Sequence, residues 1–329
     1  MADDGPRISV WHGETQRFGY LGKASPWANV VGRIEPGGSP LYTAAYEVND
    51  GPFTPLVLGP SAYRLRDPGD FNVEVPLSSL RRGMNSLLLQ ASDEAGNVTR
   101  KTVRIDYGGM EAWPLPYTID WSSVGNLQDV VQVIDGSWAI SSEGIRPTRM
   151  AYDRLVALGD LSWNHYEVST TFTIHGYEST PAIYGWPSYG PAVGLLLGWG
   201  GHADWGDMVP RRGYYPHGTI GVYRWRRDGP MRRDLWAGYG NVLIAAEETG
   251  ASDPELNRPY CIKMRSEARP GERNHYSLKI WPEDREEPVA WDLAGQGAPG
   301  GRNTGGILLL AHHTDVTFGE IRVIPLSRN

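Results

Sequence analysis

The sequence predicts an all-β protein made of two β-sandwiches in series, and three observations support this fold class. No long stretch repeats its apolar side chains at the spacing of an amphipathic helix. Short runs of β-branched and aromatic residues recur instead, at intervals near the roughly 8 to 12 residues of all-β folds. Glycine and proline, which separate such runs, contribute 41 and 25 of the 329 residues. Turns between short strands therefore dominate the chain.

Composition excludes several classes of protein. The hydrophobic share of 40% and the charged share of 21% are those of an ordinary globular chain. The net charge of −7 argues against a nucleic acid as partner, because phosphate binding requires a basic surplus. No apolar run approaches the roughly 20 residues that span a bilayer, so no membrane-spanning segment is expected. Cys261 is the only cysteine, which excludes an intramolecular disulfide and a cysteine zinc site.

The first third of the chain contains the strands of a small sandwich. Seven short runs in about a hundred residues match the strand number of an immunoglobulin-like domain. Residues 92–97 (SDEAGN) are typical of a hairpin turn between the last two expected strands, because Gly96 and Asn97 tolerate positive φ. Asp93 is expected to serve this turn and not to bind a metal. The expected strands are 7–12, 27–34, 41–48, 53–58, 71–76, 85–91 and 98–106.

The run GDFNVEVPLSSLRRGMNSLLLQASDEAGNVTRKTVRI, residues 69–105, resembles bacterial immunoglobulin-like modules of extracellular proteins. The last hairpin of those modules often reads A-x-D-x-x-G-N. The resemblance implies an immunoglobulin-like β-sandwich over residues 1–107 that acts as a spacer or positioning domain. Residues 108–117 (GGMEAWPLPY) form the expected linker, since prolines restrict the chain to extended conformations.

The remaining residues, 118–329, predict a larger sandwich. Ten or more strands with hairpin punctuation indicate two stacked antiparallel sheets, a jelly roll. The expected strands are 130–134, 137–141, 165–175, 192–199, 219–226, 240–247, 259–266, 274–281, 306–312 and 316–324.

Three stretches of this half resemble the concanavalin A-like lectin and glucanase superfamily, which includes laminin-G-like domains. They are YDRLVALGDLSWNHYEVSTTFTIH, HYSLKIWPEDREEPVAWDL and GGILLLAHHTDVTFGEIRVIPL. The resemblance implies a concanavalin A-like jelly roll, and it admits a structural calcium ion as the only cofactor. It does not imply one function, because this fold hosts lectins, binding modules, hydrolases and lyases.

Aromatic residues give the clearest functional signal. The chain has 13 Trp and 17 Tyr against 5 Phe. Trp and Tyr pair a flat apolar face with a hydrogen-bonding edge, which suits the C–H face and hydroxyls of a pyranose ring. Residues 177–217 place such rings among Gly, Pro and His, as in a functional loop. Trp138, Trp163 and Tyr166 are instead assigned to the core.

We predict a saccharide platform from these residues. His202 and Asp204 are candidates to hydrogen-bond sugar hydroxyls, although a structural Gly-rich turn would also account for the segment. Use of His202, Asp204 and Asp207 as metal ligands is an alternative, but the sequence lacks a second ligand cluster and no metal site is predicted. The candidate ligand-binding residues are Trp186, Trp199, His202, Asp204, Trp205, Tyr214, Tyr215, His217, Tyr223, Trp225, Lys263 and Arg265.

Strand alternation accounts for the last four candidates. Residues 219–226 place Tyr223 and Trp225 on one face of a strand, opposite Val222 and Arg224. Lys263 and Arg265 likewise share a face opposite Ile262 and Met264. Periodicity does not tell which of these faces lines a concave sheet, where a polysaccharide would lie, and which is ordinary solvated surface.

Catalysis is an open alternative. Laminarinase-type members of the superfamily carry E-x-D-x-x-E on one strand, and that pattern is absent. Lyases of this fold would use Arg, His and Tyr, and no motif orders such residues here. The catalytic residues are therefore unassigned.

The sequence as a whole predicts polysaccharide or oligosaccharide binding through an aromatic-lined concave face. A glycoside hydrolase or polysaccharide lyase using the same face is the first alternative, and a structural or adhesive surface module is the second. The expected location is outside a bacterial cell or on its surface, although the opening residues MADDGPR contain no apolar signal segment.

Overall fold

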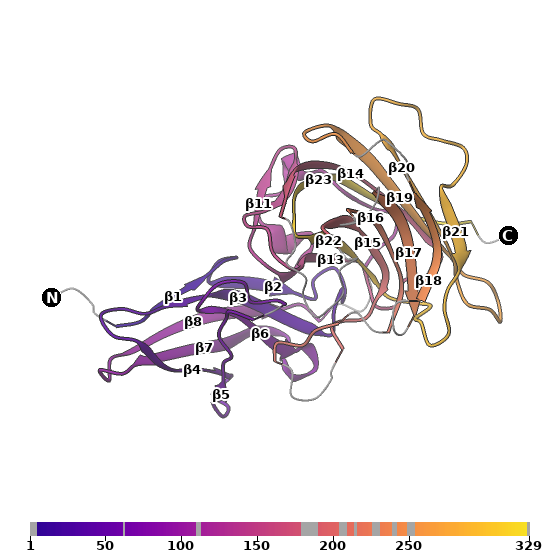
Figure 1. Cartoon of the computed structure of the whole chain (residues 1–329). Coiled ribbons are helices and arrows are strands. Elements are labelled where there is room, and N and C mark those ends of the chain that lie inside the picture. The colour runs from indigo at the N-terminus through magenta and orange to yellow at the C-terminus, as the bar shows by residue number, and fades with distance from the viewer. Residues whose placement is uncertain are drawn as a thin grey trace.

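The computed structural model shows a chain built almost entirely of β-strands (Figure 1). Its helical elements, among the residues that the structure describes, are the 3-10 turns η1 (Leu77–Ser79), η2 (Trp121–Ser123) and η3 (Leu127–Asp129). None of them is long and apolar enough to cross a bilayer. The all-β fold class is confirmed. The described residues are 5–61, 63–109, 113–178, 190–203, 209–213, 216–225, 231–238, 242–248 and 254–327.

Two sheets form the smaller sandwich. Its three-stranded sheet has the order β1 (Arg7–Val10), β3 (Trp27–Glu35) and β6 (Asp70–Pro76). Its five-stranded sheet has the order β2 (Thr15–Phe18), β8 (Val98–Tyr107), β7 (Gly83–Asp93), β4 (Leu41–Val48) and β5 (Thr54–Pro55).

The β7–β8 hairpin closes through the turn that the sequence predicts. The Asn97 backbone N–H and side-chain amide each donate to the Asp93 carboxylate at 2.8 Å. These hydrogen bonds hold the pKa of Asp93 below its ordinary value. Gly96 takes φ +86°, a conformation that favours glycine. Asp93 and Asn97 therefore act as turn residues.

Two further sheets form the jelly roll. The seven-stranded sheet has the order β10 (Gln132–Asp135), β13 (Arg154–Leu158), β22 (Gly306–His312), β15 (Ala192–Trp199), β16 (His217–Arg224), β17 (Arg232–Gly238) and β18 (Val242–Glu248). The eight-stranded sheet has the order β11 (Trp138–Ser141), β12 (Gly144–Pro147), β23 (Thr314–Pro325), β14 (Tyr166–Tyr177), β19 (Pro259–Glu267), β20 (His275–Pro282) and β21 (Leu293–Gln296), with β9 (Tyr117–Ile119) pairing β23.

The larger hydrophobic core lies between these two sheets. Ile262 and Met264 of β19 have no exposed surface and belong to this core. The eight-stranded sheet wraps around the outside of the seven-stranded sheet (Figure 1). Strands β13 and β15 are buried along their whole length, so both of their faces are covered.

Several strands escape sequence prediction for identifiable reasons. Strand β13 (RLVAL) is short and lacks alternation because both faces are buried. Strand β17 begins with two arginines and has no apolar start. Strands β2, β9, β12 and β21 are four residues or shorter, which is too short for a periodic signal.

The two sandwiches are packed against each other. Ala24 and Val31 belong to the larger hydrophobic cluster although they come from the first third of the chain. The indole N–H of Trp163 donates to the carbonyl of Trp113 at 2.9 Å, which ties the connecting segment to the jelly roll. The boundaries at residues 107 and 118 remain a prediction, as does the immunoglobulin-like assignment.

A substitution in the larger core tests its placement. We expect Leu309→Ala on β22 to lower the free energy of unfolding by about 2 to 5 kcal/mol, because Leu309 has no exposed surface and truncation leaves a cavity. The fully exposed Val289 is the matched control, and Val289→Ala should change stability by no more than about 0.5 kcal/mol. Urea denaturation measures both; equal effects would contradict the assignment of Leu309 to the core.

Candidate functional site

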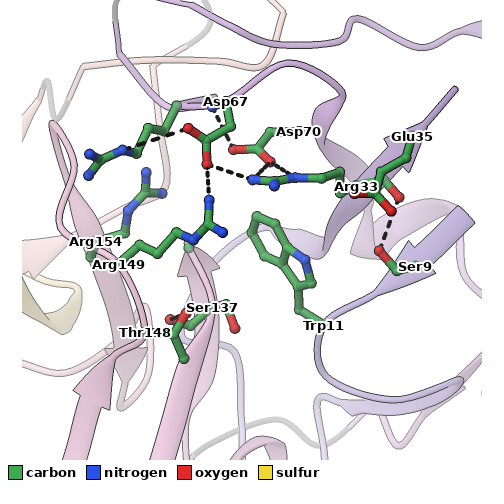
Figure 2. Close-up of a pocket in the computed structure, with 12 residues that line it drawn as sticks. Ser9, Trp11, Arg33, Glu35, Asp67, Asp70, Ser137, Thr148, Arg149 and Arg154 are labelled. Carbon is green, nitrogen blue, oxygen red and sulfur yellow. Dashed lines mark hydrogen bonds and ion pairs between the residues drawn. The ribbon is translucent and has the colours of Figure 1, made fainter. Parts of the chain in front are cut away.

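A cleft of about 240 Å³ lies where the two sandwiches meet (Figure 2). Its lining combines one indole with many hydrogen-bonding groups from both sandwiches. The lining residues are Ser9, Trp11, Arg33, Glu35, Arg66, Asp67, Asp70, Gly136, Ser137, Thr148, Arg149 and Arg154.

The smaller sandwich supplies the wall that carries the indole and the carboxylates. Trp11 directly follows β1, and its backbone N–H donates to the carbonyl of Val31 on β3 at 3.0 Å. Its half-buried ring also packs against the core of the jelly roll. Asp67 and Asp70 come from the turn that enters β6, where Asp70 Oδ2 accepts from the backbone N–H of Asp67 at 2.9 Å.

The jelly roll supplies the opposite wall. Gly136 and Ser137 form the turn between β10 and β11, and Thr148 follows β12. The backbone N–H of Thr148 donates to the carbonyl of Ser137 at 2.8 Å, which fixes these two hydroxyl-bearing residues beside each other. Arg149 follows Thr148, and Arg154 begins β13.

Ion pairs hold the charged groups of the cleft in place. Arg33 donates to Asp67 at 2.6 Å and to Asp70 at 2.8 Å, and Arg149 also donates to Asp67 (Figure 2). Partial burial raises the pKa of Asp67, but the hydrogen bonds and charges of the two arginines outweigh burial and hold that pKa below its ordinary value. Asp67 is therefore an ionised hydrogen-bond acceptor at neutral pH.

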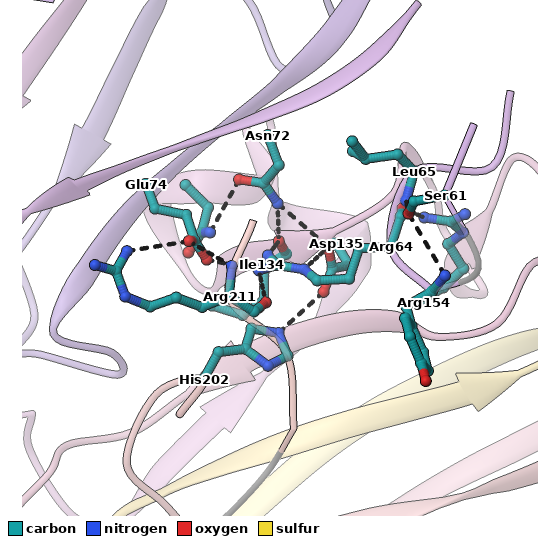
Figure 3. A network of polar contacts seen from close by, with 12 residues as sticks. Ser61, Arg64, Leu65, Asn72, Glu74, Ile134, Asp135, Arg154, His202 and Arg211 are labelled. Carbon is teal, nitrogen blue, oxygen red and sulfur yellow. Dashed lines mark hydrogen bonds and ion pairs between the residues drawn. The ribbon is translucent and has the colours of Figure 1, made fainter. Parts of the chain in front are cut away.

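A buried polar network lies next to the cleft and joins the two sandwiches (Figure 3). Arg64, from the smaller sandwich, donates from Nε to Asp135 of β10 at 2.7 Å and from Nη1 to Glu74 of β6 at 2.6 Å. Asn72 donates to the carbonyl of Ile134 at 2.8 Å. All three charged groups are almost completely shielded from solvent.

His202 belongs to this network. Its Nε2 lies 3.1 Å from Asp135 Oδ2 and its Nδ1 lies 3.1 Å from the carbonyl oxygen of Gly213. The His202 side chain is buried, so it joins two parts of the interface and does not present a free edge to a sugar. This placement corrects the prediction that His202 contacts a ligand directly.

Four other candidates from the sequence prove to be buried. Trp199 and His217 have no exposed surface, and Tyr223 and Trp225 are 6% and 8% exposed. Tyr223 shares a strand face with Gly221, where a Cβ would lie 2.6 Å from the Met264 sulfur of the opposite sheet. That face therefore looks into the inter-sheet core and not onto an open groove. The predicted exposed platform is wrong for these four residues.

One aromatic ring beside the predicted loop is exposed. Tyr177, at the end of β14, is 45% exposed and its ring centroid lies 4.7 Å from that of Trp225. The candidates Trp186, Asp204, Trp205, Tyr214 and Tyr215 lie outside the described residues, as does Asp207.

Lys263 and Arg265 lie on the outer face of the eight-stranded sheet, away from the core. Lys263 Nζ is 2.6 Å from Glu287, and Arg265 Nη2 is 2.8 Å from Glu167. Arg265 also lies over the ring of Trp291 at 4.9 Å. The structure thus decides what periodicity left open: these two cations are on the outer side of the sandwich, where they are paired with carboxylates.

A metal site is not evident in the part of the chain that the structure describes. No group of three or more His, Cys, Asp or Glu side chains there is arranged to hold a metal ion. Calcium remains a prediction of the sequence resemblance, and no residue is assigned to it.

Sequence reasoning missed the cleft because its residues come from separate parts of the chain. Trp11, Asp67 and Arg149 stand in unrelated local patterns, and only packing of the two sandwiches unites them. One signal existed: Arg154 starts the otherwise apolar run RLVAL. A charged residue at such a position is rarely buried without a specific reason.

Comparisons with known proteins identify no relatives by sequence. No family and no curated protein matches the chain. Solved structures with a similar shape include the VIP36 exoplasmic/lumenal domain bound to Ca²⁺ and Man3GlcNAc, at 12% identity, covering 62% of this chain and 87% of that one, with a TM-score of 0.42. The Emp47p carbohydrate recognition domain is 10% identical, with coverages of 65% and 97% and a TM-score of 0.42.

A Bacillus subtilis protein of unknown function with a galectin-like fold is also similar in shape. It is 14% identical, with coverages of 65% and 96% and a TM-score of 0.44. Likenesses at this distance do not assign a ligand or a site to this chain, so its function is argued from its own residues.

The buried network predicts acid sensitivity. Burial raises the pKa of Asp135, but Arg64 and His202 outweigh burial and hold it below its ordinary value. The stability contributed by this carboxylate is therefore present above its unfolded pKa of about 3.9 and is lost as the pH falls through its folded pKa. We expect Asp135→Asn to cost about 3 to 5 kcal/mol at pH 7, because it leaves Arg64 without one partner. The deficit should shrink below about pH 4.

Thermal unfolding between pH 7 and pH 3 measures this effect. The control is Asp284→Asn, because the Asp284 side chain is 64% exposed and its pairing with Arg258 lies at the surface. An exposed pair contributes only about 0 to 1 kcal/mol. A pH-independent deficit in Asp135→Asn would contradict the role assigned to its carboxylate.

Proposed function

We propose that this protein binds a saccharide, without cleaving it, in the cleft between its two sandwiches. The observation that carries the proposal is the indole of Trp11 beside a fixed set of ionised and hydroxyl groups. An indole offers an apolar face to the C–H side of a sugar ring. The surrounding carboxylates accept, and the guanidinium groups donate, the hydrogen bonds of ring hydroxyls.

The size of the cleft supports recognition of a single sugar unit. Pockets for drug-sized ligands hold roughly 300 to 1,000 Å³, whereas this cleft holds about 240 Å³. One ring would lie against Trp11 while the rest of an oligosaccharide or polysaccharide extends outside. A polymeric partner of this kind fits a protein that works outside the bacterial cell, and that location is part of the proposal.

The electrostatics of the cleft favour binding over hydrolysis. Glycosidases need one carboxyl group whose raised pKa lets it donate a proton to the leaving oxygen. Asp67 has the opposite property, since its pKa is held low by Arg33 and Arg149. Asp70 is occupied by Arg33 on one oxygen and by the Asp67 backbone N–H on the other. Neither of these two carboxyls is therefore suited to act as the general acid. The third carboxyl of the lining, Glu35, is half exposed and lies 3.6 Å from Arg7.

Proton abstraction also lacks a suitable group among the described lining residues. A lyase needs a histidine, tyrosine or similar base near the sugar ring. His12 follows Trp11 in the sequence, and its Nε2 lies 3.3 Å from the carbonyl oxygen of Gly136. Burial holds the pKa of His12 below its ordinary value, although that backbone hydrogen bond opposes the effect. His12 is not one of the lining residues, so the described lining presents neither an imidazole nor a phenol to a sugar ring.

Trp11→Ala should weaken saccharide binding. We expect at least a tenfold loss of affinity, about 1.4 kcal/mol, because the stacking surface is removed. Isothermal titration against oligosaccharides of dextran, β-glucan, alginate and polygalacturonate measures the affinity of the wild type and the variant. Trp291→Ala is the matched control, since Trp291 lies on the outer face of the jelly roll. Unchanged binding in Trp11→Ala would move the site elsewhere, and no binder in the panel would favour a structural or adhesive module.

The protein should leave the same polysaccharides chemically unchanged. We expect no new reducing ends and no unsaturated uronates after prolonged incubation, because Asp67 is held ionised, Asp70 is engaged on both oxygens, and the described lining presents no histidine or tyrosine. Reducing-sugar and ultraviolet absorbance assays measure the two products. Release of either product by the wild type, but not by a variant of a cleft carboxylate such as Asp67→Asn, would show that the cleft is catalytic. That result would contradict the proposal of binding without cleavage.

A further inference from the structure

Arg154 is an unusual member of the cleft because its charge is buried. The residue is 4% exposed, and the strand that it begins is buried throughout. Transfer of an ion out of water costs several kcal/mol unless close partners compensate it. The contacts of its guanidinium group therefore decide what the residue does.

No close carboxylate among the described residues compensates the charge of the Arg154 guanidinium group. The only hydrogen bond of the Arg154 side chain to the described residues joins Nη1 to the carbonyl oxygen of Arg64 at a long 3.4 Å (Figure 3). No carboxylate among those residues lies within 4.0 Å of it, the limit for an ion pair, whereas the other three arginines of the cleft each have one. Arg33 and Arg149 pair with Asp67, and Arg66 pairs with Glu178 at 2.8 Å.

The carboxylates around Arg154 each pair with another arginine or with a histidine. Asp135 pairs with Arg64 and His202, Asp70 pairs with Arg33, and Asp153 lies 2.8 Å from His312 Nδ1. Burial lowers the pKa of Arg154, and the charges of these three acids offset this only in part. The nearby charge of Arg66 lowers the pKa further. A guanidinium group nevertheless stays protonated at neutral pH, so a positive charge persists at this point.

The Arg154 side chain is also held in a fixed position. It crosses Gly136, where a Cβ would collide with Arg154 Cδ. Gly136 takes φ +82°, so glycine suits both the turn and the close approach of the arginine. The guanidinium group lies beside that of Arg149 at the cleft (Figure 2). Two neighbouring cations and the hydroxyl-bearing residues Ser137 and Thr148 thus line the same cleft.

We propose that Arg154 binds an anionic substituent of the saccharide, either the carboxylate of a uronic acid or a sulfate ester. This inference rests on the proposed saccharide site and specifies its ligand. A guanidinium fork matches both oxyanions in a bidentate manner. Arg149 supplies a second positive charge at the cleft, and Trp11 contacts the ring that carries the substituent. The bound anion would compensate the positive charge of Arg154, which no nearby carboxylate among the described residues does.

Arg154→Met separates this role from a structural one. Methionine keeps most of the volume and removes the charge. If the arginine serves a ligand, the variant should melt at the same or a higher temperature, because replacing an uncompensated buried charge with an apolar group is neutral or stabilising. A marked fall in melting temperature, together with unchanged affinity for charged sugars, would overturn the proposal.

Binding is measured with matched neutral and charged probes. Galacturonate is compared with galactose, and galactose 6-sulfate distinguishes the sulfate ester from the carboxylate. We expect the charged sugars to bind the wild type at least tenfold more tightly than galactose, and we expect Arg154→Met to remove that preference. Arg285→Met is the control for loss of one positive charge, since the Arg285 side chain is 72% exposed.

The outcomes separate the two proposals. Equal binding of galactose and galacturonate, weakened alike by Trp11→Ala, would keep the saccharide site and overturn the anionic ligand. A preference for charged sugars that survives in Arg154→Met would also overturn the role of Arg154. Tight binding of galacturonate that depends on Arg154 but not on Trp11 would support the anion site and contradict the indole platform. Absence of binding by every probe would overturn both.

Discussion

The buried ion pairs of Arg64 with Asp135 and Glu74 set the geometry on which the rest of the structure depends. The Arg64–Asp135 pair joins the smaller sandwich to the jelly roll, and the Arg64–Glu74 pair holds Arg64 within the smaller sandwich. Both pairs are out of contact with water, where an unpaired charge would be costly. The two sandwiches are consequently held in one relative position. The cleft between them is a product of that position, because neither sandwich alone carries both of its walls.

Charge is distributed in two ways around this junction. In the Arg64 network each carboxylate meets a cation directly, which suits a role in holding the interface together. In the cleft Arg33 and Arg149 restrain Asp67, while Arg154 is left with one long hydrogen bond to a carbonyl. Groups that serve a ligand are commonly held in an arrangement that is not optimal for the protein alone. This contrast is the physical basis for placing recognition in the cleft and mechanical attachment in the network.

The abundance of Trp and Tyr did not indicate which of these rings line a cleft and which lie in the core. Tyr223 shares a strand face with Gly221, and that face looks into the core. Trp199 lies in a strand whose two faces are both buried, so its indole packs and does not stack on a sugar. Trp11, which does line a cleft, stands in a part of the chain where the local pattern indicated only a strand end. Periodicity reports that two faces differ, but not which of them another layer will cover.

The sequence by itself determined the all-β class, most strand positions and the Asp93–Asn97 hairpin, because these follow from interactions between residues close in the chain. Only the tertiary structure decided that Lys263 and Arg265 lie on the outer sheet face, that His202 belongs to an interface, and that Arg154 faces a cleft. Each of those outcomes depends on segments far apart in the chain, packed together by burial and paired charges. No local pattern encodes such proximity.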